Sequence, residues 1–193
     1  MPRPREFDET VALQAAIDCF WQRGYQATSV RDLATSMGIS GPSLYNAFGD
    51  KHDLFARALE HYLDSSTRVR IERFEQTLPP KRAIRGFFED IVARSVGDRE
   101  RRGCFLINSA LEVAPHDAKL GAIIADRLGE IEAFFHRSIR AAQRDGTVSR
   151  AVNAKDVARL LLSVLLGIRV LARAKPDKAL LEGVMRSALA ALG

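Results

Sequence analysis

The sequence has little of what an exported or membrane-spanning protein needs. It contains only two cysteines, Cys19 and Cys104, which are too few for a disulfide framework. Its longest apolar run, 160–168, is interrupted by Ser163 and Gly167 and is shorter than the roughly 20 apolar residues that cross a bilayer. No apolar segment of a secretory signal follows the N-terminus. These absences predict a cytoplasmic protein without a membrane partner.

Strand signals are nearly absent as well. No segment alternates apolar and polar residues over a sustained stretch, and no Asn-Gly or Asp-Gly turn joins two β-branched segments. Apolar residues recur instead with helical spacing along the chain. Because 47% of the residues are apolar, such helices can bury a real core. The predicted fold class is therefore all-α.

Glycine, proline and helix-capping residues mark where the helices begin and end. Before a break at Pro79-Pro80, the predicted helices are 9–23, 30–37, a short one that Ser40 caps and that runs to about Ala47, and one that starts near Lys51 with an apolar stripe reaching Tyr62. After the break they are 80–97, 104–113, 118–145, 154–174 and 177–192. We interpret the chain as a bundle of small helices over 1–60 and a bundle of longer helices over 61–193.

The distribution of charge limits what the total charge can mean. The chain carries 29 Lys and Arg against 24 Asp and Glu, and its pI near 9.6 fits a nucleic-acid partner. Residues 1–60, however, hold six basic and eight acidic side chains, a net charge of −2. Residues 61–193 hold the remaining 23 basic and 16 acidic side chains, a net charge of +7. The basic excess therefore does not identify the first 60 residues as a DNA-binding part.

Residues 28–54 contain the physical parts of a helix-turn-helix. Leu33 and Met37 give its first helix an inner face, and Gly38 supplies a left-handed turn. Leu44 and Phe48, four residues apart, anchor its second helix to the core. The other side chains of the second helix then face outward, where its N-terminal half can enter a major groove. Its free N–H groups also favour a phosphate.

This segment resembles the DNA-binding domain of TetR-family regulators. The stretch that carries the resemblance is R-D-L-A-x-x-M-G-I-S-x-x-S-L-Y-x-x-F-x-D-K-x-D-L-F, which follows F-W-Q-R-G-Y-Q-A-T-S. The match covers about 9–62 without a gap. A second stretch, R-G-C-F-L-I-N-S-A-L-E-V-A-P-H-D over 102–117, resembles a segment of one subgroup of the family. The resemblance implies a homodimeric repressor of double-stranded operator DNA, with a divergent C-terminal domain that binds a small-molecule inducer and forms the dimer.

Carried over position by position, the family pattern implies a set of DNA contacts. Tyr45 and Lys51 would touch phosphates. The complete set is Arg3, Arg5, Thr28, Ser29, Arg31, Ser40, Gly41, Pro42, Ser43, Tyr45, Asn46 and Lys51. Because Gly41 and Ala47 have no hydrogen-bonding side chain, direct base readout rests on Ser43, Asn46 and Arg31. DNA shape and an Arg3/Arg5 arm in a minor groove are a further hypothesis.

The inducer site is expected within 80–174. The candidate ligand-binding residues are Phe88, Cys104, Phe105, Asn108, Glu112, Phe134, Leu162 and Arg169. Glu112 and Arg169 stand out because a buried charge needs a partner or a ligand. They can equally pair with each other or reach solvent. No cofactor is expected, and the four histidines do not have the spacing of a metal site.

Cys104 leaves an alternative open. It follows Gly103 at the start of a predicted helix, close to Arg101 and Arg102, and helix N-termini and nearby cations are the surroundings in which cysteines are reactive. It can therefore sense oxidants or electrophiles, or simply fill space. An enzyme with Cys104 as nucleophile and His116 or His136 as base is a weaker alternative, because no orienting third group or oxyanion turn is recognisable. A DNA binder without a ligand, constitutive or activating, also stays open.

The last two predicted helices carry more apolar surface than one core-facing stripe requires. In 154–174, Leu162 and Leu166 lie off the main stripe, and Gly167 allows a close backbone approach. Two such helix pairs can form a four-helix bundle across a two-fold axis, although an ordinary buried helix is the alternative. We expect the dimer, because a repressor of this type reads two half-sites about one helical turn apart.

Overall fold

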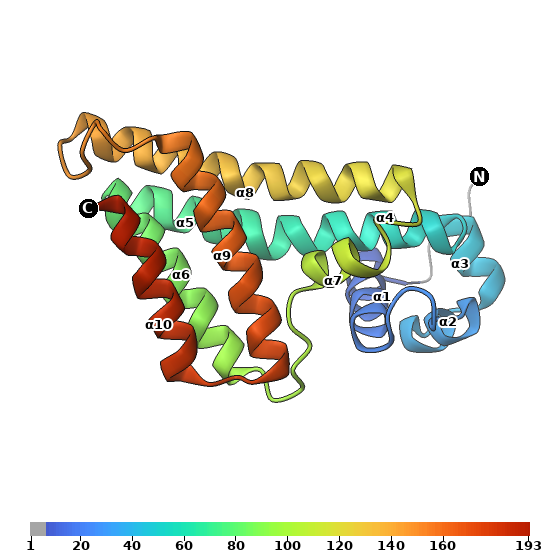
Figure 1. The fold of residues 1–193 in the computed structure, drawn as a ribbon. Helices are drawn as coiled ribbons and strands as arrows, with labels where there is room; N and C mark the ends of the chain where they lie inside the picture. Colours follow the sequence, from blue (N-terminus) through green and yellow to red (C-terminus); the bar gives the residue numbers. More distant parts are fainter. Residues whose placement is uncertain (1–6) are drawn as a thin grey trace.

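The computed structural model describes residues 7–193, and this part of the chain contains helices and no strand (Figure 1). The first half holds α1 (Glu9–Arg23), α2 (Val30–Met37), α3 (Gly41–Phe48), α4 (Lys51–Tyr62), a π-helical segment (Leu63–Arg68) and α5 (Val69–Thr77). The second half holds α6 (Pro80–Gly97), α7 (Phe105–Glu112), α8 (Ala118–Arg144), α9 (Ala154–Ala174), α10 (Lys178–Leu189) and a final 3₁₀ turn (Ala190–Leu192). The all-α prediction is confirmed.

Side-chain caps explain why the helices start where the sequence predicted. Asp8, Ser29, Ser40 and Asp50 each accept hydrogen bonds from free N–H groups in the first turn of α1 to α4. Asp117 does the same for α8, and the pattern repeats at α9 and α10. Polar residues at these positions satisfy donors that would otherwise have no partner inside the helix.

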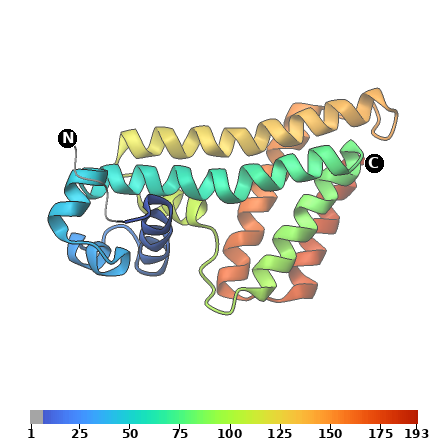
Figure 2. The same cartoon turned by 180° about the vertical axis from the view of Figure 1, so that it is seen from behind.

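Two long parallel rods run along the molecule and connect its two ends. One rod is α4, the π-helical segment and α5 in succession, and the other is α8 (Figures 1 and 2). Helices α1 to α3 lie at one end, whereas α6, α9 and α10 lie at the other, with α7 between them. The proposed boundary at 60/61 falls inside the first rod, so the two regions share a continuous helical stretch.

The stretch between Tyr62 and Pro79 has no helix in the sequence-based prediction, yet the structure makes it helical. Its buried side chains are few, namely Leu63, Ile71 and Phe74, and most of the rest are charged or polar. The wider π-helical turn is stabilised by Ser66 Oγ, which donates to the carbonyl of Tyr62 at 2.5 Å. A mostly exposed rod leaves too few apolar positions for periodicity to reveal it.

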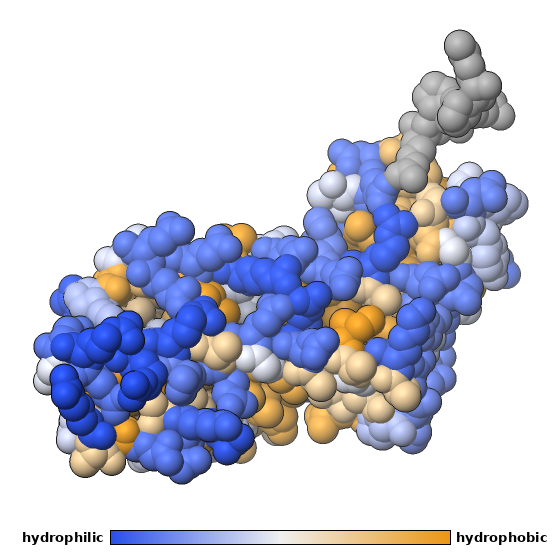
Figure 3. All heavy atoms as spheres, turned by 90° about the horizontal axis from the view of Figure 1, so that it is seen from above, coloured by the Kyte–Doolittle hydropathy of each residue, from blue (hydrophilic) through white to orange (hydrophobic). Residues whose placement is uncertain are grey.

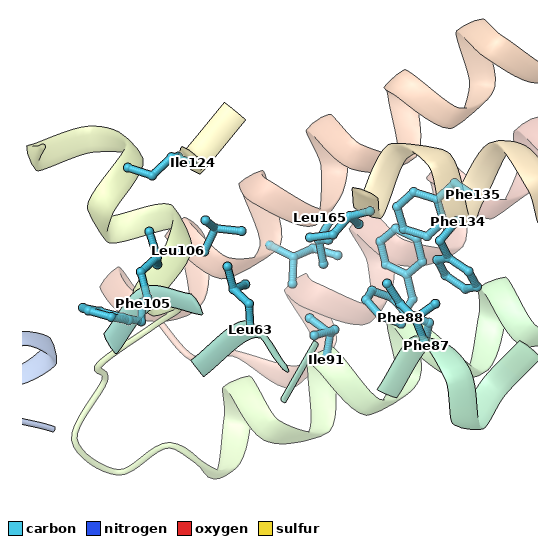
Figure 4. Packing of buried hydrophobic residues seen from close by; sticks show 14 of the residues in the cluster. Leu63, Phe87, Phe88, Ile91, Phe105, Leu106, Ile124, Phe134, Phe135 and Leu165 are labelled. Atoms are coloured by element: carbon cyan, nitrogen blue, oxygen red, sulfur yellow. The ribbon is translucent and has the colours of Figure 1, made fainter. Parts of the chain in front are cut away.

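Aromatic rings fill the core of the C-terminal bundle. Phe87 and Phe88 of α6 meet Phe134 and Phe135 of α8, and all four are essentially inaccessible to solvent (Figure 4). Phe88 stacks on Phe135 with ring centroids 5.5 Å apart. The sequence left open whether one ring of each pair faces a cavity. All four rings are buried in the core, and Phe87 also lines a small inner cavity.

The outer face over α8 is mostly hydrophilic, with apolar side chains scattered through it (Figure 3). Across residues 7–193, no helix is both long and apolar enough to cross a membrane.

Removing one ring of the aromatic core tests its contribution to stability. We expect Phe135→Ala to lower the free energy of unfolding by about 3–5 kcal/mol, because it leaves a cavity among closely packed rings. Chemical denaturation followed by circular dichroism measures this. The neighbouring exposed position provides the control, since His136→Ala should change stability by less than about 0.5 kcal/mol. Equal effects of the two changes would contradict the packing described.

Candidate DNA-binding surface and ligand cavity

Helices α2 and α3 form a helix-turn-helix whose inner residues are fully packed. Leu33, Leu44 and Phe48 are buried, as the sequence predicted. Gly38 closes α2 in the left-handed conformation, with φ of 67°, which a residue with a Cβ adopts only under strain. The outward face of α3 is thereby fixed by the turn and by two anchoring side chains.

The exposed face of α3 presents the side chains expected there. Tyr45 is 53% exposed, and Pro42 and Asn46 are also exposed. Gly41 and Ser43 are half-buried at the start of the helix. Ser40 caps that start and its Oγ lies 2.8 Å from Ser43 Oγ, so both hydroxyls are already engaged locally.

The residues before α2 differ in what they can offer a phosphate. Ser29 and Asp32 form a reciprocal capping box, in which Ser29 Oγ donates to the Asp32 carboxylate at 2.6 Å. Hydrogen bonds from Ser29 hold the pKa of Asp32 below its usual value. Arg31 is exposed and makes no hydrogen bond or ion pair with the rest of the described chain. It is therefore the freest cation of this surface.

Thr28 corrects the prediction of a phosphate-facing side chain. It is 1% exposed, and its hydroxyl donates to the carbonyl of Gly24 at 2.6 Å. Its role is to close the turn between α1 and α2. Arg3 and Arg5, the predicted minor-groove arm, lie outside the described residues.

Lys51 is half-buried at the first position of α4. Its ammonium group lies 4.4 Å from the centre of the Tyr25 ring, a cation–π contact with the turn before α2. Burial lowers the pKa of Lys51, and the carboxylate of Glu112 opposes that effect. The contact holds the lysine in place at the end of the helix-turn-helix.

A single main-chain carbonyl joins the helix-turn-helix end to α7. The carbonyl of Arg102 accepts a hydrogen bond from Trp21 Nε1 at 3.0 Å and another from Asn108 Nδ2 at 2.8 Å. The Arg102 guanidinium lies over the Trp21 ring at 4.7 Å and contacts Asp18. Trp21 belongs to α1 and Asn108 to α7, so this carbonyl links the two helices.

Two further contacts join the same regions at the other end of α7. Glu112 Oε1 accepts from the backbone N–H of Gln26 at 2.9 Å. Gly24 makes this approach possible, because a Cβ at that position would lie 2.8 Å from Glu112 Oε2. The φ of Gly24 is +83°, a backbone conformation that favours glycine. His52 of α4 lies 2.9 Å from Asp117, the cap of α8. Helix α7 is thus fastened to the N-terminal region at both of its ends.

A small cavity of about 30 Å³ lies inside the C-terminal bundle next to α7. Cys104 and Arg169, two of the predicted ligand residues, line it. Cys104 Sγ lies 3.8 Å from Tyr62 Oη, and burial above all raises the pKa of the Tyr62 phenol, which stays neutral. Residues Thr67, Arg70, Phe87, Ile91, Leu106, Ile107, Leu128, Ile131, Leu165 and Leu166 complete the lining.

The other predicted ligand residues are not in this cavity. Phe88 and Phe134 are packed in the aromatic core, and Leu162 lies on α9 outside the lining. These three residues therefore do not line the inner cavity, and the two rings take part in the packing of the core instead. Phe105, Asn108 and Glu112 line a separate groove of about 370 Å³ between α1 and α7. Glu112 and Arg169 therefore do not pair with each other.

Sequence reasoning missed three polar residues of the cavity wall. They are Tyr62, Thr67 and Arg70, which come from the π-helical segment and its two neighbours. Tyr62 belongs to an apolar stripe in the sequence-based interpretation, and the residues after it were given no structure. Recognising the segment 63–78 as helical is the one signal that would have brought all three to the same wall.

Arg70 belongs to a cluster in which three guanidinium groups share one carboxylate. Asp90 lies 2.8 Å from Arg70 Nε, 3.2 Å from Arg73 and 2.7 Å from Arg94. Burial would raise the pKa of Asp90, but the hydrogen bond from Arg94 and the nearby charges outweigh it and hold the pKa low. Burial lowers the pKa of Arg70, and Asp90 opposes that effect. The cluster therefore carries an excess of positive charge.

The geometry gives the enzyme alternative little support. His116 and His136 are exposed, and neither lines the cavity that contains Cys104. Among residues 7–193, one group, Asp50, His52 and Asp53, brings three possible metal ligands within 4.8 Å of one another. It lies at the surface, and His52 already contacts Asp117. Exposed groups of this kind are common without an ion.

An apolar hollow of about 580 Å³ lies on the surface between α9 and α10. Leu160 and Leu180, which line it, are 44% and 40% exposed. The other residues of the hollow are Val164, Ala179, Gly183, Val184, Ser187 and Ala188. The hollow leaves apolar surface of these two helices uncovered in the single chain. It is not formed by Leu162 and Leu166, which were expected to supply that surface, and Leu166 lines the inner cavity instead.

Comparison with known proteins identifies the family. Residues 12–58 match the family of bacterial regulatory proteins named tetR, and residues 80–188 match the tetracyclin repressor-like C-terminal domain. The chain belongs to the TetR family. It is a DNA-binding transcriptional regulator of the helix-turn-helix type.

TetR-family relatives align over most of this chain. An uncharacterized HTH-type transcriptional regulator of Bacillus subtilis strain 168, YezE, is 35% identical over 92% of this chain and 92% of its own. The transcriptional repressor ComR of Escherichia coli K12 is 28% identical over 96% of this chain and 88% of its own. A cysteine-substituted variant of the TetR family regulator CifR, solved with 26-base-pair operator DNA, is 33% identical, with a TM-score of 0.89 over 99% of this chain and 100% of that one.

Replacing the shared carboxylate tests the arginine cluster. We expect Asp90→Asn to lower the free energy of unfolding by about 2 kcal/mol at pH 7, less than for a fully buried pair because Asp90 keeps some exposure. The low pKa of Asp90 means that its contribution is complete above the ordinary carboxyl pKa and is lost as the pH falls through the folded-state value.

The difference between wild type and D90N should therefore shrink as the pH falls below about 4. Urea unfolding at a series of pH values measures it. Glu89→Gln, at the exposed neighbouring position, is the matched control and should change stability by less than about 0.5 kcal/mol. A D90N effect that stays constant with pH would contradict the assignment.

Proposed function

We propose that this TetR-family regulator is a ligand-responsive homodimeric repressor of a palindromic operator. Residues 1–60 would bind DNA, and residues 61–193 would bind the inducer and form the dimer. The observation that carries the proposal is the combination of an exposed α3 face with a cavity whose wall includes α7, a helix that is linked to α1 through the Arg102 carbonyl. The similarity to a regulator solved on its operator supports the DNA-binding half.

DNA recognition would place α3 in a major groove. Tyr45 and Asn46 are exposed on its outward face, and Ser43 lies at its N-terminal end. Arg31 and Lys51 would contact phosphates on either side, together with the free N–H groups at the helix starts. Gly41 would let the backbone approach the bases closely, since no atom lies within 4 Å of a Cβ built there. Base readout then depends on few side chains and on DNA shape.

Dimerisation would cover the apolar hollow of α9 and α10. Leucine exposed at 40% or more on adjacent helices is unfavourable in water, and pairing two copies about a two-fold axis buries both hollows at once. The resulting four-helix bundle would fix the separation of two α3 helices, which a palindromic operator requires.

The ligand response would pass through α7. A molecule that enters the inner cavity must enlarge it, because the cavity has only about 30 Å³. In the proposed response, the part of the wall that moves is Leu106 and Ile107 of α7. Movement of α7 would pull on Trp21 through the Arg102 carbonyl and on Gln26 through Glu112. The helix-turn-helix would then leave the spacing that the operator requires. Thermodynamic reciprocity requires DNA to weaken inducer binding by the same factor.

Thiol sensing through Cys104 is a second candidate for the same response. The observation that favours it is that Cys104 lines the cavity at the start of α7, with Tyr62 Oη 3.8 Å from its sulfur. A covalent adduct there would displace α7 in the same direction as a bound ligand.

Changing single contacts tests the DNA surface. Arg31→Ala should reduce the slope of log affinity against log salt by about 1 per protomer, because one phosphate contact is lost. Tyr45→Phe should weaken operator binding by about tenfold through loss of a hydrogen bond to a charged group. Replacing Arg3 and Arg5 by Ala should also lower affinity and salt slope. Fluorescence anisotropy at several salt concentrations measures all of these.

Arg82→Ala provides the control for charge, since Arg82 is an exposed arginine on α6 at the other end of the molecule. It should leave the slope unchanged. The wild-type slope should itself be shallow, because residues 1–60 are net negative. A steep slope, or an Arg82 effect equal to that of Arg31, would show that the basic C-terminal region reaches DNA.

The dimer is tested by placing a charge in the hollow. Leu160→Glu or Leu180→Glu should convert the dimer into a monomer and abolish tight operator binding, because a carboxylate cannot be buried there without a partner. Light scattering after gel filtration measures the mass. Val11→Glu, at an exposed apolar position on α1 outside the hollow, should leave the dimer intact. A wild-type monomer, or selected genomic fragments without two-fold symmetry, would refute the dimer.

A further inference from the structure

Three side chains separate the inner cavity from a much larger groove on the surface. The groove has about 650 Å³ and is lined by the π-helical segment, the end of α6 and the loop that precedes α7. Tyr62, Arg70 and Arg169 line both the groove and the inner cavity. A small molecule in the groove therefore reaches the cavity past one phenol and two guanidinium groups.

Arg169 has no carboxylate partner among the described residues. Its two terminal nitrogens donate to neutral oxygens, Ser95 Oγ at 2.9 Å and the carbonyl of Gly103 at 2.8 Å. Its Nε is buried and has no hydrogen-bond partner. Arg169 is half-buried, so its guanidinium is partly removed from water while only neutral groups offset its charge.

The second cation of the wall is also incompletely neutralised. The Arg70 side chain is only 13% exposed, and its Nε lies 2.8 Å from Asp90, but the N–H is not aligned for a hydrogen bond. Arg73 and Arg94 share the same carboxylate. Five arginines and two carboxylates line the groove, whereas two arginines and no carboxylate line the cavity. Positive charge is therefore concentrated at the wall that the two spaces share.

Beyond this wall the cavity is apolar. Ile91, Leu106 and Leu165 come from three different helices and lie around it (Figure 4). Ile131 of α8 lines it as well. The space thus combines a cationic entrance with an apolar interior. Arginine forks match the two oxygens of a carboxylate, and a buried cation with a carboxylate partner is far less costly than one without.

We propose that the inducer is an organic anion, a carboxylate with a compact apolar body. Its carboxylate would bind Arg169 and Arg70 with the Tyr62 hydroxyl, and its apolar body would enter and enlarge the inner cavity. This assignment rests on the ligand response proposed above and names the chemistry of the ligand. It also gives the neutral Tyr62 phenol a function, because a protonated phenol donates a hydrogen bond to a carboxylate.

Trp21 makes binding measurable without DNA. It is the single tryptophan of the chain, it lines the groove, and its ring lies 5.1 Å from that of Tyr62. The probes are straight-chain carboxylates from acetate to decanoate and benzoate, each paired with its neutral amide. Titration of the purified dimer should change Trp21 fluorescence saturably with at least one carboxylate, and the matching amide should bind at least about tenfold more weakly.

Variants of the wall separate recognition from folding. Arg169→Gln should weaken carboxylate binding by about 30-fold or more, whereas Arg169→Lys should keep part of the affinity because the charge remains. Arg82→Gln, an exposed arginine outside both spaces, should change affinity by less than about twofold. If R169Q does not fold, the R169K result and the acid-to-amide ratio of the wild type still decide the proposal.

Release of the operator, measured by fluorescence anisotropy, tests two hypotheses separately. One is that the inducer is an organic anion, and the other is that the protein is a ligand-responsive repressor. Carboxylate binding at Trp21 without operator release would support the site and refute the ligand-responsive repressor. Release by neutral amides alone, equal binding of acid and amide, or no response to any carboxylate would overturn the anion assignment. A last outcome would also overturn the anion assignment. In it, N-ethylmaleimide releases the operator, Cys104→Ser abolishes that release, and no carboxylate has an effect, because the Cys104 thiol would then be the sensor.

Discussion

The carbonyl oxygen of Arg102 is the contact on which the architecture depends. It accepts hydrogen bonds from α1 and from α7 at once, through Trp21 and Asn108. A carbonyl has two acceptor positions, so one rigid backbone atom joins an N-terminal helix to a C-terminal one. Gly103, with φ of +74°, turns the chain directly after it, and its own carbonyl accepts from Arg169. Arg102, which connects the two regions, and Gly103, which accepts a hydrogen bond from an arginine of the cavity wall, are therefore consecutive residues of one loop.

The ligand response proposed above depends on this arrangement. Helix α7 has only two turns, and it is fastened to α1 and the following turn at both ends while its inner side forms part of the cavity. Closely packed interiors do not deform continuously, so a change in cavity volume moves short helices as units. In the proposed response, Arg70 and Arg169 bind the carboxylate of the ligand. The ligand enlarges the cavity, α7 moves, and α1 moves with it.

The sequence predicted the helix-turn-helix well because local interactions determine it. Capping residues, Gly38 and the spacing of Leu44 and Phe48 fix α2 and α3 without reference to distant residues. The cavity was predicted poorly for the opposite reason. Phe88 and Phe134 were expected at the ligand, but which ring of an adjacent pair faces a cavity depends on helices far away in the sequence. Thr28 was misjudged similarly, since the Gly24 carbonyl that captures its hydroxyl is known only from the turn geometry.

Sequence alone determined the all-α class, nearly every helix boundary outside 62–79, the TetR-family resemblance and the exposed face of α3. Each follows from periodicity, capping or motif spacing within a short stretch of chain. Tertiary structure decided that α4 and α5 form one rod, that Tyr62, Arg70 and Arg169 share a wall, and that Arg169 has no carboxylate partner. These depend on contacts between residues up to about a hundred positions apart. Charge neutralisation and cavity volume are properties of such contacts, and no local pattern encodes them.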